Sequence, residues 1–211
     1  MAEPDRTAHW ADLLATILLS VAAVATAWAT YQAAHYRSEQ GLAGNRSTAA
    51  RVQANRASGV ANRQIQIDAL TFTHWVDAYT HGDKKLAAFY FRRFRREFRP
   101  AVTAWAATRP LTNRDAPLTP FSMPQYTSAE NAEADRLEVK GAAESVIAQA
   151  DVQRADRYTL CVVLFATALF FAGISTRLRT TGSRIFVLAM GWLLFSSAFL
   201  WMITFPLSLS R

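Results

Sequence analysis

Three long windows of this chain contain no charged residue, and they constrain its fold more than any other feature. The windows cover residues 13–36, 158–176 and 185–210. As α-helices they would be roughly 28 to 39 Å long, against about 30 Å for the hydrocarbon core of a bilayer. The sequence therefore predicts an all-α integral membrane protein with three transmembrane helices.

Aromatic residues lie near both ends of the first window, as in the interfacial belts of membrane helices. They are Trp10, Trp28, Tyr31 and Tyr36. The small residues at 25–27 also fit a signal-peptide cleavage site, which is the competing interpretation. However, the residues before the window carry more acidic than basic charge, and the window exceeds the usual 7–15 residues of a signal peptide. We therefore expect a retained helix, with residues 1–36 forming the N-terminal tail and first span.

Residues 158–211 are predicted to form a hairpin of two spans. The connection, residues 177–184, is short, has Gly182 as its expected turn residue, and carries three arginines and no acid. By the positive-inside rule, this loop and the N-terminus would be cytoplasmic and residues 37–157 extracytoplasmic. Arginines also lie near the other membrane ends, so the opposite orientation stays open. These are Arg37, Arg46, Arg51, Arg154 and Arg157.

Residues 37–157 form the predicted extramembrane region, a long helical hairpin. Residues 37–80 lack proline, which favours a helix continuing from the first span. The small or apolar residues expected to support this helix are Ala49, Val52, Ala57, Val60, Ile67 and Leu70. His81-Gly82-Asp83 supplies a helix stop and a new N-cap.

A basic helix is predicted from Lys84 to about Arg99. Ala87, Phe91, Phe94 and Phe98 share one of its faces. Pro100 fits the first turn of a following short helix that presents Val102 and Trp105. The four prolines within residues 109–125 exclude a regular helix and make the turnaround.

A second long helix is predicted to begin at Ser128 and to continue into the second span. Its expected packing positions follow a seven-residue repeat and a complementary one, which suggests a coiled coil of small residues. They are Ala132, Val139, Val146, Ala143 and Ala150. Residues 84–114 carry nine basic groups and one acid, whereas residues 128–157 carry four basic groups and seven acids. These opposite charges predict that the two segments face each other, within one chain or between chains.

The arginines of the basic helix are candidates for contact with anionic lipid or an acidic partner. They are Arg92, Arg93, Arg95, Arg96 and Arg99. In the simpler interpretation, the phenylalanines cover the long helices and the arginines meet acids of residues 128–157. We do not expect a nucleic-acid partner, because the segment is tethered beside a membrane.

The sequence contains no assembled catalytic, cofactor or metal motif, so we expect no enzyme activity and no cofactor. His74, Asp77 and His81 would share a helix face, but they match no metal-binding motif. The single cysteine, Cys161, lies inside the second span, where its thiol would be inert.

Within the spans, ionisable residues are absent away from the ends, whereas small residues recur at four-residue spacing. Such faces let helices approach closely, so a homo-oligomer is expected. The hydroxyls of the first span fall within about 120° on a helical projection. They could therefore form a helix-packing face or line a pore. They are Thr16, Ser20, Thr26 and Thr30. The sequence thus favours a homo-oligomeric scaffold or interaction module, with a passive channel or transport accessory as the alternative.

Several strings carry a resemblance along nearly the whole chain. They are residues 25–34 around Trp28, Tyr31 and Gln32, residues 75–83, residues 94–101 with Trp105, and residues 169–177. In these the chain resembles a family of uncharacterised bacterial inner-membrane proteins. That resemblance implies a bacterial source and an architecture of one N-terminal span, a helical middle and a C-terminal two-span hairpin. It implies no activity and no functional residue.

Overall fold

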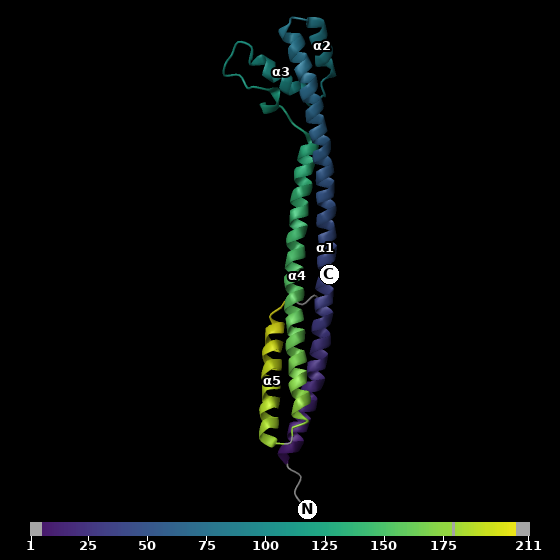
Figure 1. The fold of residues 1–211 in the computed structure, drawn as a ribbon, viewed down its shortest axis with the longest axis vertical. Helices are drawn as coiled ribbons and strands as arrows, with labels where there is room; N and C mark the ends of the chain where they lie inside the picture. Colours follow the sequence, from purple (N-terminus) through teal and green to yellow (C-terminus); the bar gives the residue numbers. More distant parts are fainter. Residues whose placement is uncertain (1–5, 179, 206–211) are drawn as a thin grey trace, which may run out of the picture. The chain divides into compact units, whose positions relative to one another are not determined.

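The structure is a computed structural model that describes residues 6–178 and 180–205, and within them it contains only helices, turns and irregular segments. The helices are α1 (Arg6–Thr80), α2 (Lys84–Arg93), α3 (Arg99–Ala107), the short 3-10 helix η1 (Pro120–Ser122), α4 (Ala129–Ser175) and α5 (Thr181–Ile203) (Figure 1). Three of them, α1, α4 and α5, are long and apolar enough to cross a membrane. This confirms the all-helical class and the three candidate spans.

The chain divides into two compact units. We call residues 1–45 with 144–211 the terminal unit, and residues 46–143 the middle unit. Helices α1 and α4 each contribute residues to both units and are unbroken at the boundary. The expected continuation of the first and second spans as long helices is therefore confirmed.

The core of the terminal unit is built from small residues on α1 and a mixture of small and aromatic residues on α4 and α5. From α1 the core takes Ala11, Ala15, Leu18, Ala22, Ala25 and Ala29; from α4 Tyr158, Cys161, Phe165, Ala168 and Ala172; from α5 Leu188, Phe195, Ala198 and Met202. At Gly191 of α5, an added Cβ would lie 3.1 Å from the Leu18 side chain and 3.4 Å from the Ala168 carbonyl. The three helices therefore meet closely at this glycine.

The middle unit has an aromatic core where α2 and α3 pack on the end of α1. Its buried residues are Phe72, Trp75, Ala78, Ala87, Phe94, Phe98, Ala101, Val102 and Trp105. The short helix expected after Pro100 is present as α3, and the two residues it was expected to present, Val102 and Trp105, are buried in this core. The Trp105 indole N–H also donates to the Pro117 carbonyl at 2.6 Å, which ties the proline-rich turnaround to the core.

Small residues also join α1 to α4 within the middle unit. The Ser47 hydroxyl donates to the Gly141 carbonyl at 2.7 Å. A Cβ on Gly141 would lie 3.3 Å from the Ser47 carbonyl, so the two backbones are close. The buried positions here are Ser47, Ala50, Ala54 and Ala61 on α1 and Ala134 and Gly141 on α4.

The expected packing repeat of the second long helix is wrong. Ala132, Val139, Val146 and Ala143 are exposed and Ala150 is half-buried. Of the six positions singled out in residues 37–80, five are likewise exposed and Ala57 is half-buried; the exposed five are Ala49, Val52, Val60, Ile67 and Leu70. A repeat that includes Val139 and Val146 does not fit this contact, because two backbones this close accept only Gly, Ala and Ser between them.

Both predicted helix caps are confirmed. Asp83 accepts a hydrogen bond from the Leu86 N–H at 2.9 Å, and Gly82 adopts the positive φ of 75° that lets α1 stop. Ser128 accepts from the Asn131 N–H at 3.2 Å at the start of α4.

The basic helix is shorter than expected, because α2 ends at Arg93 and Phe94 is extended. The bend lets Phe94 and Phe98 both enter the aromatic core. It leaves carbonyls without helical partners, and the Arg99 guanidinium donates to two of them, on Phe94 at 3.1 Å and Arg92 at 2.7 Å.

The expected role of Gly182 is also wrong. Helix α5 begins at Thr181, so Gly182 lies in its first turn without a positive φ, and residues 176–180 make the connection instead. Arg179 of that connection and the expected end of the third span near Leu207 lie outside the described residues.

Candidate functional site: the Arg95 network and the basic surface

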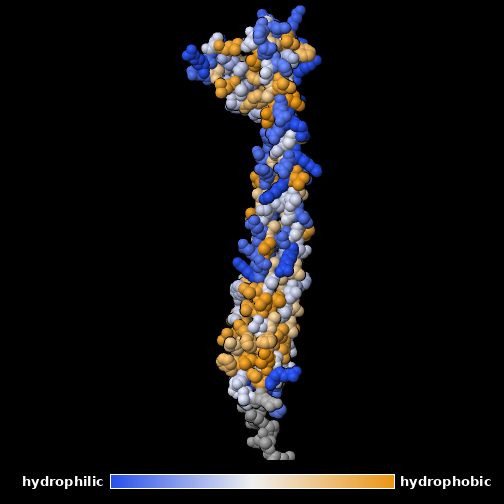
Figure 2. All heavy atoms as spheres, in the orientation of Figure 1, coloured by the Kyte–Doolittle hydropathy of each residue, from blue (hydrophilic) through white to orange (hydrophobic). Residues whose placement is uncertain are grey.

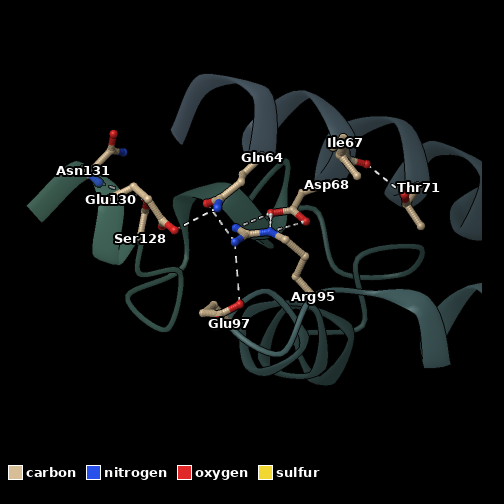
Figure 3. Close-up of polar contacts among 9 residues, drawn as sticks. All are labelled: Gln64, Ile67, Asp68, Thr71, Arg95, Glu97, Ser128, Glu130 and Asn131. Atoms are coloured by element: carbon tan, nitrogen blue, oxygen red, sulfur yellow. Dashed lines mark hydrogen bonds and ion pairs between the residues drawn. The ribbon is translucent and has the colours of Figure 1, made fainter. Parts of the chain in front are cut away.

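Arg95 lies in the bend after α2, and its side chain turns back to α1 (Figure 3). Its Nε lies 3.1 Å from both carboxylate oxygens of Asp68, and its Nη2 donates to Asp68 Oδ2 at 2.9 Å. The Asp68 side chain is 1% exposed and that of Arg95 21% exposed. This is a two-pronged pair between a nearly buried acid and a largely buried base, the geometry in which arginine binds carboxylate most strongly.

The pair extends into a network that reaches α4 (Figure 3). Arg95 Nη1 donates to Gln64 Oε1 at 2.8 Å, and Gln64 Nε2 donates to Glu130 Oε1 at 2.9 Å. Glu97 lies 3.6 Å from the same guanidinium. The network therefore holds α1, the α2–α3 bend and the first turn of α4 together.

The electrostatics of the network do not suit proton transfer at neutral pH. The hydrogen bond with Asp68 raises the pKa of Arg95. Burial raises the pKa of the neighbouring Tyr126 phenol. The amide of Gln64 lowers the pKa of the Glu130 carboxyl. Each shift moves the group further from pH 7, so these side chains keep fixed charge states, as a structural network requires.

The structure separates the five predicted arginines. Arg95 forms an ion pair inside the middle unit. Its partner is Asp68 on α1, and not one of the predicted acids of residues 128–157. The Arg99 guanidinium binds the carbonyls of the bend. Arg93 lies over the Phe89 ring, 3.6 Å from its centroid. Arg92 and Arg96 are exposed and make no ion pair among the described residues.

A basic surface remains around the bend once Arg95 is set aside. It consists of Lys84, Lys85, Arg92, Arg93 and Arg96, all exposed. Within residues 84–114 Glu97 is the one acid, and it faces Arg95. The surface could bind an anionic group without breaking the internal network.

The hydroxyls predicted as a packing or pore face lie outside the core of their own chain. Thr16, Ser20 and Thr30 are exposed and Thr26 is half-buried. Each donates to the carbonyl four residues earlier, at distances of 2.7 to 2.9 Å. The hydroxyl groups thus already have hydrogen-bond acceptors on their own helix. A packing or pore-lining role between chains stays a prediction.

The candidate metal ligands of α1 do not converge. His74 stacks on Tyr90 with ring centroids 5.6 Å apart, and His81 Nδ1 lies 3.3 Å from Asp77 Oδ1 on the exposed end of the helix. Within residues 6–178 and 180–205, no group of three or more His, Cys, Asp or Glu side chains has metal-binding geometry.

Sequence reasoning missed Gln64, Asp68, Tyr126 and Glu130. A usable signal was present, because small residues at 47, 54 and 61 are followed, seven residues later, by Asp68. A carboxylate that continues a buried repeat must be paired, because burial of an unpaired charge is costly. The arginine-rich residues 84–99 could supply the partner. The choice of Arg95 among the arginines depended on the bend at Phe94, which the sequence pattern did not predict.

Comparison with known proteins gave no match to a protein-family model, to a curated protein or to a solved structure. The resemblance noted from the sequence strings therefore stays a prediction. Any functional conclusion rests on the residues and contacts described above.

Proposed function

We propose that the chain is a multi-pass protein of the bacterial cell membrane, a homo-oligomeric scaffold or interaction module that catalyses no reaction. The observation that supports this most is the outer surface of the terminal unit. Hydrophobic residues gather over α5 and the adjoining parts of α1 and α4 (Figure 2). Its large exposed residues include Ile17, Val21 and Val24 on α1, Val163 and Phe170 on α4, and Phe186, Leu193, Leu200 and Ile203 on α5.

Two polar contacts between helices of the terminal unit lie at the ends of the apolar stretches, as at the two faces of a bilayer. Asp12 pairs with Arg184 beside the starts of the first and third windows. At the other end of the first window, Arg37 donates to the Thr159 hydroxyl at 3.2 Å. Tyr158 there packs between Tyr36 and Phe205, an aromatic group typical of an interface.

The middle unit would supply the interaction surface. Its aromatic core and Arg95 network make a rigid base, and the basic surface presents cations suited to anionic lipid headgroups or an acidic protein. A contact with lipid contributes roughly 1 kcal/mol per well-placed basic residue.

Membrane embedding and orientation can be tested together in cells. Alkaline carbonate should leave the chain in the membrane pellet. In a Cys161→Ala background, a membrane-impermeant maleimide should label Leu118→Cys in intact cells and Ser183→Cys only after lysis. Release by carbonate contradicts the proposal, whereas the inverse labelling pattern reverses the orientation and leaves the embedding intact.

The channel alternative is supported by one observation, the line of hydroxyls exposed on the apolar stretch of α1. If they line a pore between copies, Ser20→Leu with Thr26→Leu should abolish ion flux in liposomes. Wild-type liposomes without flux, or flux unchanged in the variant, would exclude these residues as a pore lining.

A further inference from the structure

In the middle unit, α1 carries an exposed stripe on the side away from its contact with α4. We call it the aliphatic–arginine stripe; it consists of Val52, Arg56, Val60, Arg63, Ile67 and Leu70, all exposed. At about 100° per residue these six positions fall within about 80°, roughly opposite the buried Ala54 and Ala61. Ile67 and Leu70 are 59% and 63% exposed. The larger aliphatic residues of this part of α1 thus face outward at the three- and four-residue spacing of a helix-packing face.

Helix α4 offers a complementary edge in the same unit. An open cleft of about 500 Å³ lies between the two helices and is lined by Arg51, Asn55, Glu138, Val139 and Ala142. Asp135 lies one turn before Glu138 and is exposed, as are Val139 and Ala142. We call Asp135, Glu138, Val139 and Ala142 the acidic edge.

The charges of the two helices are complementary but are not paired with each other inside the chain. Residues 46–67 contain four arginines and no acid, whereas residues 129–143 contain four acids and two bases. In the described part of the chain, none of these four arginines forms an ion pair; Glu133 pairs only with Arg136 of its own helix. The stripe and the edge are therefore complementary in charge, both include exposed apolar side chains, and neither is used inside the chain.

We propose that the aliphatic–arginine stripe of one copy docks on the acidic edge of a second copy. This inference rests on the proposed function, because it assigns residues to the homo-oligomer. A closed symmetric assembly uses the same pair of surfaces at every interface, and each chain carries one of each.

The contacts inside the chain give the register of this interface. Within one copy, residue 47 lies against 141 and residue 64 against 130. Residue 52 is therefore level with 139, and residue 56 with 135. Copies inserted side by side in one membrane share these levels, which places Val52 against Val139 and Arg56 against Asp135 of the neighbouring copy.

Charge reversal tests this register. The full chain is purified in mild detergent and its mass is followed by light scattering over a concentration series. Arg56→Glu should raise the concentration needed for half-assembly at least about tenfold, and adding Asp135→Arg should restore it. Arg114→Glu, at an exposed position of the proline-rich turnaround, is the matched control and should leave this concentration unchanged. Near-UV circular dichroism checks that each variant keeps the aromatic core.

Cysteine cross-linking gives a second, independent measurement. In the Cys161→Ala background, Val52→Cys with Val139→Cys should oxidise to a disulfide-linked ladder of chains in membranes. Replacing Val52→Cys by Asn62→Cys, which is exposed but off the stripe, should leave the chains as monomers on a denaturing gel.

The outcomes separate this inference from the proposed function. Release from membranes by carbonate would defeat the proposed function itself. A membrane-embedded chain that is monomeric, or an oligomer unchanged by Arg56→Glu and not cross-linked through 52 and 139, would overturn the docking of stripe on edge and leave the embedding untouched.

Discussion

The two units bury different side chains of α1: alanines in the terminal unit, and in the middle unit alanines beside α4 but aromatic rings beside α2 and α3. In the terminal unit, α1 buries alanines at Ala15, Ala22 and Ala29 and exposes large aliphatic residues. In the middle unit, the core holds Phe, Trp and Val side chains, and much of the surface is charged. Water drives large apolar side chains inward, whereas lipid gives no such drive and leaves close packing of small residues to hold helices together. The aromatic core of the middle unit is typical of packing in water, and the alanines of α1 in the terminal unit fit the proposal that this unit is embedded in lipid.

Buried polar groups differ between the units as well. Ser175 in the terminal unit donates to the Ala172 carbonyl of its own helix, and buried Asp151 pairs with Arg154 three residues away. In the middle unit, Arg95 reaches Asp68 across 27 residues of sequence, and Gln64 reaches Glu130 across 66. A buried polar group that bonds within its own helix does not determine which helix packs against it, so packing there depends on the apolar surface. A bond between distant segments determines which segments meet.

The largest expected effect is the loss of an aromatic ring from the middle unit. Phe98 is fully buried among Phe72, Phe94, Phe121 and Tyr126, so Phe98→Ala should destabilise the unit by about 3–5 kcal/mol. Thermal unfolding followed by near-UV circular dichroism measures it. The control Phe89→Ala removes a ring that is 39% exposed and should cost less than about 1 kcal/mol. Equal losses in the two variants would show that the aromatic core is not packed as described.

Removing the buried acid should come next. Asp68→Ala leaves the Arg95 guanidinium largely buried without its partner, which should cost about 3 kcal/mol at pH 7. The double variant Asp68→Ala with Arg95→Met should recover part of the loss, because no unpaired charge remains. Thermal unfolding of both variants decides the matter, and a double variant less stable than Asp68→Ala would argue against a charge penalty.

A matched pair of arginine substitutions tests the comparison between the units directly. Leu193 on α5 and Leu118 in the proline-rich turnaround are 68% and 94% exposed. Leu193→Arg should cost about 3 kcal/mol if lipid surrounds that position, and Leu118→Arg almost nothing in water. The amount of chain recovered in carbonate-washed membranes reports the difference. Equal recovery of the two variants would mean that both positions face the same solvent.

The smallest expected effect is a pH dependence at Glu130. Its pKa lies below the usual 4.5 because Gln64 donates to the carboxylate. The unfolded chain therefore takes up this proton first as pH falls, so the contribution to stability is complete above about pH 5 and disappears at lower pH. Wild type should melt slightly above Glu130→Gln at pH 7, and the gap should close towards pH 3. A gap that stays constant across this range would remove the link to Glu130.

Much of the architecture followed from local patterns. Charge-free windows marked the three long apolar helices, and the Gly82–Asp83 and Ser128 signals placed two helix boundaries. The bend at Phe94 did not follow, because residues 84–99 have a continuous helical pattern. Burial of Phe94 and Phe98 in the core outweighed the local preference for helix.

The candidate site was predictable only in part. The density of arginines in residues 84–99 indicated a basic surface, but the expected pairing with acids of residues 128–157 was wrong, since Arg95 pairs with Asp68. The identity of that acid did not follow, because Asp68 is read from sequence as one polar residue on a long helix. The packing face of α4 was misassigned for a related reason, since Val139 has the stronger apolar signal and Gly141 makes the closer contact.

By itself, the sequence determined that this chain is helical, where its three long apolar stretches lie, and that its charges are segregated. These properties depend on composition and spacing along one helix. Only the tertiary structure decided which faces of α1 and α4 touch, that Arg95 turns inward to Asp68, and that the aliphatic–arginine stripe stays exposed. Those choices depend on how closely two backbones can approach and on which buried charge finds a partner, and both are settled between segments that are distant in the sequence.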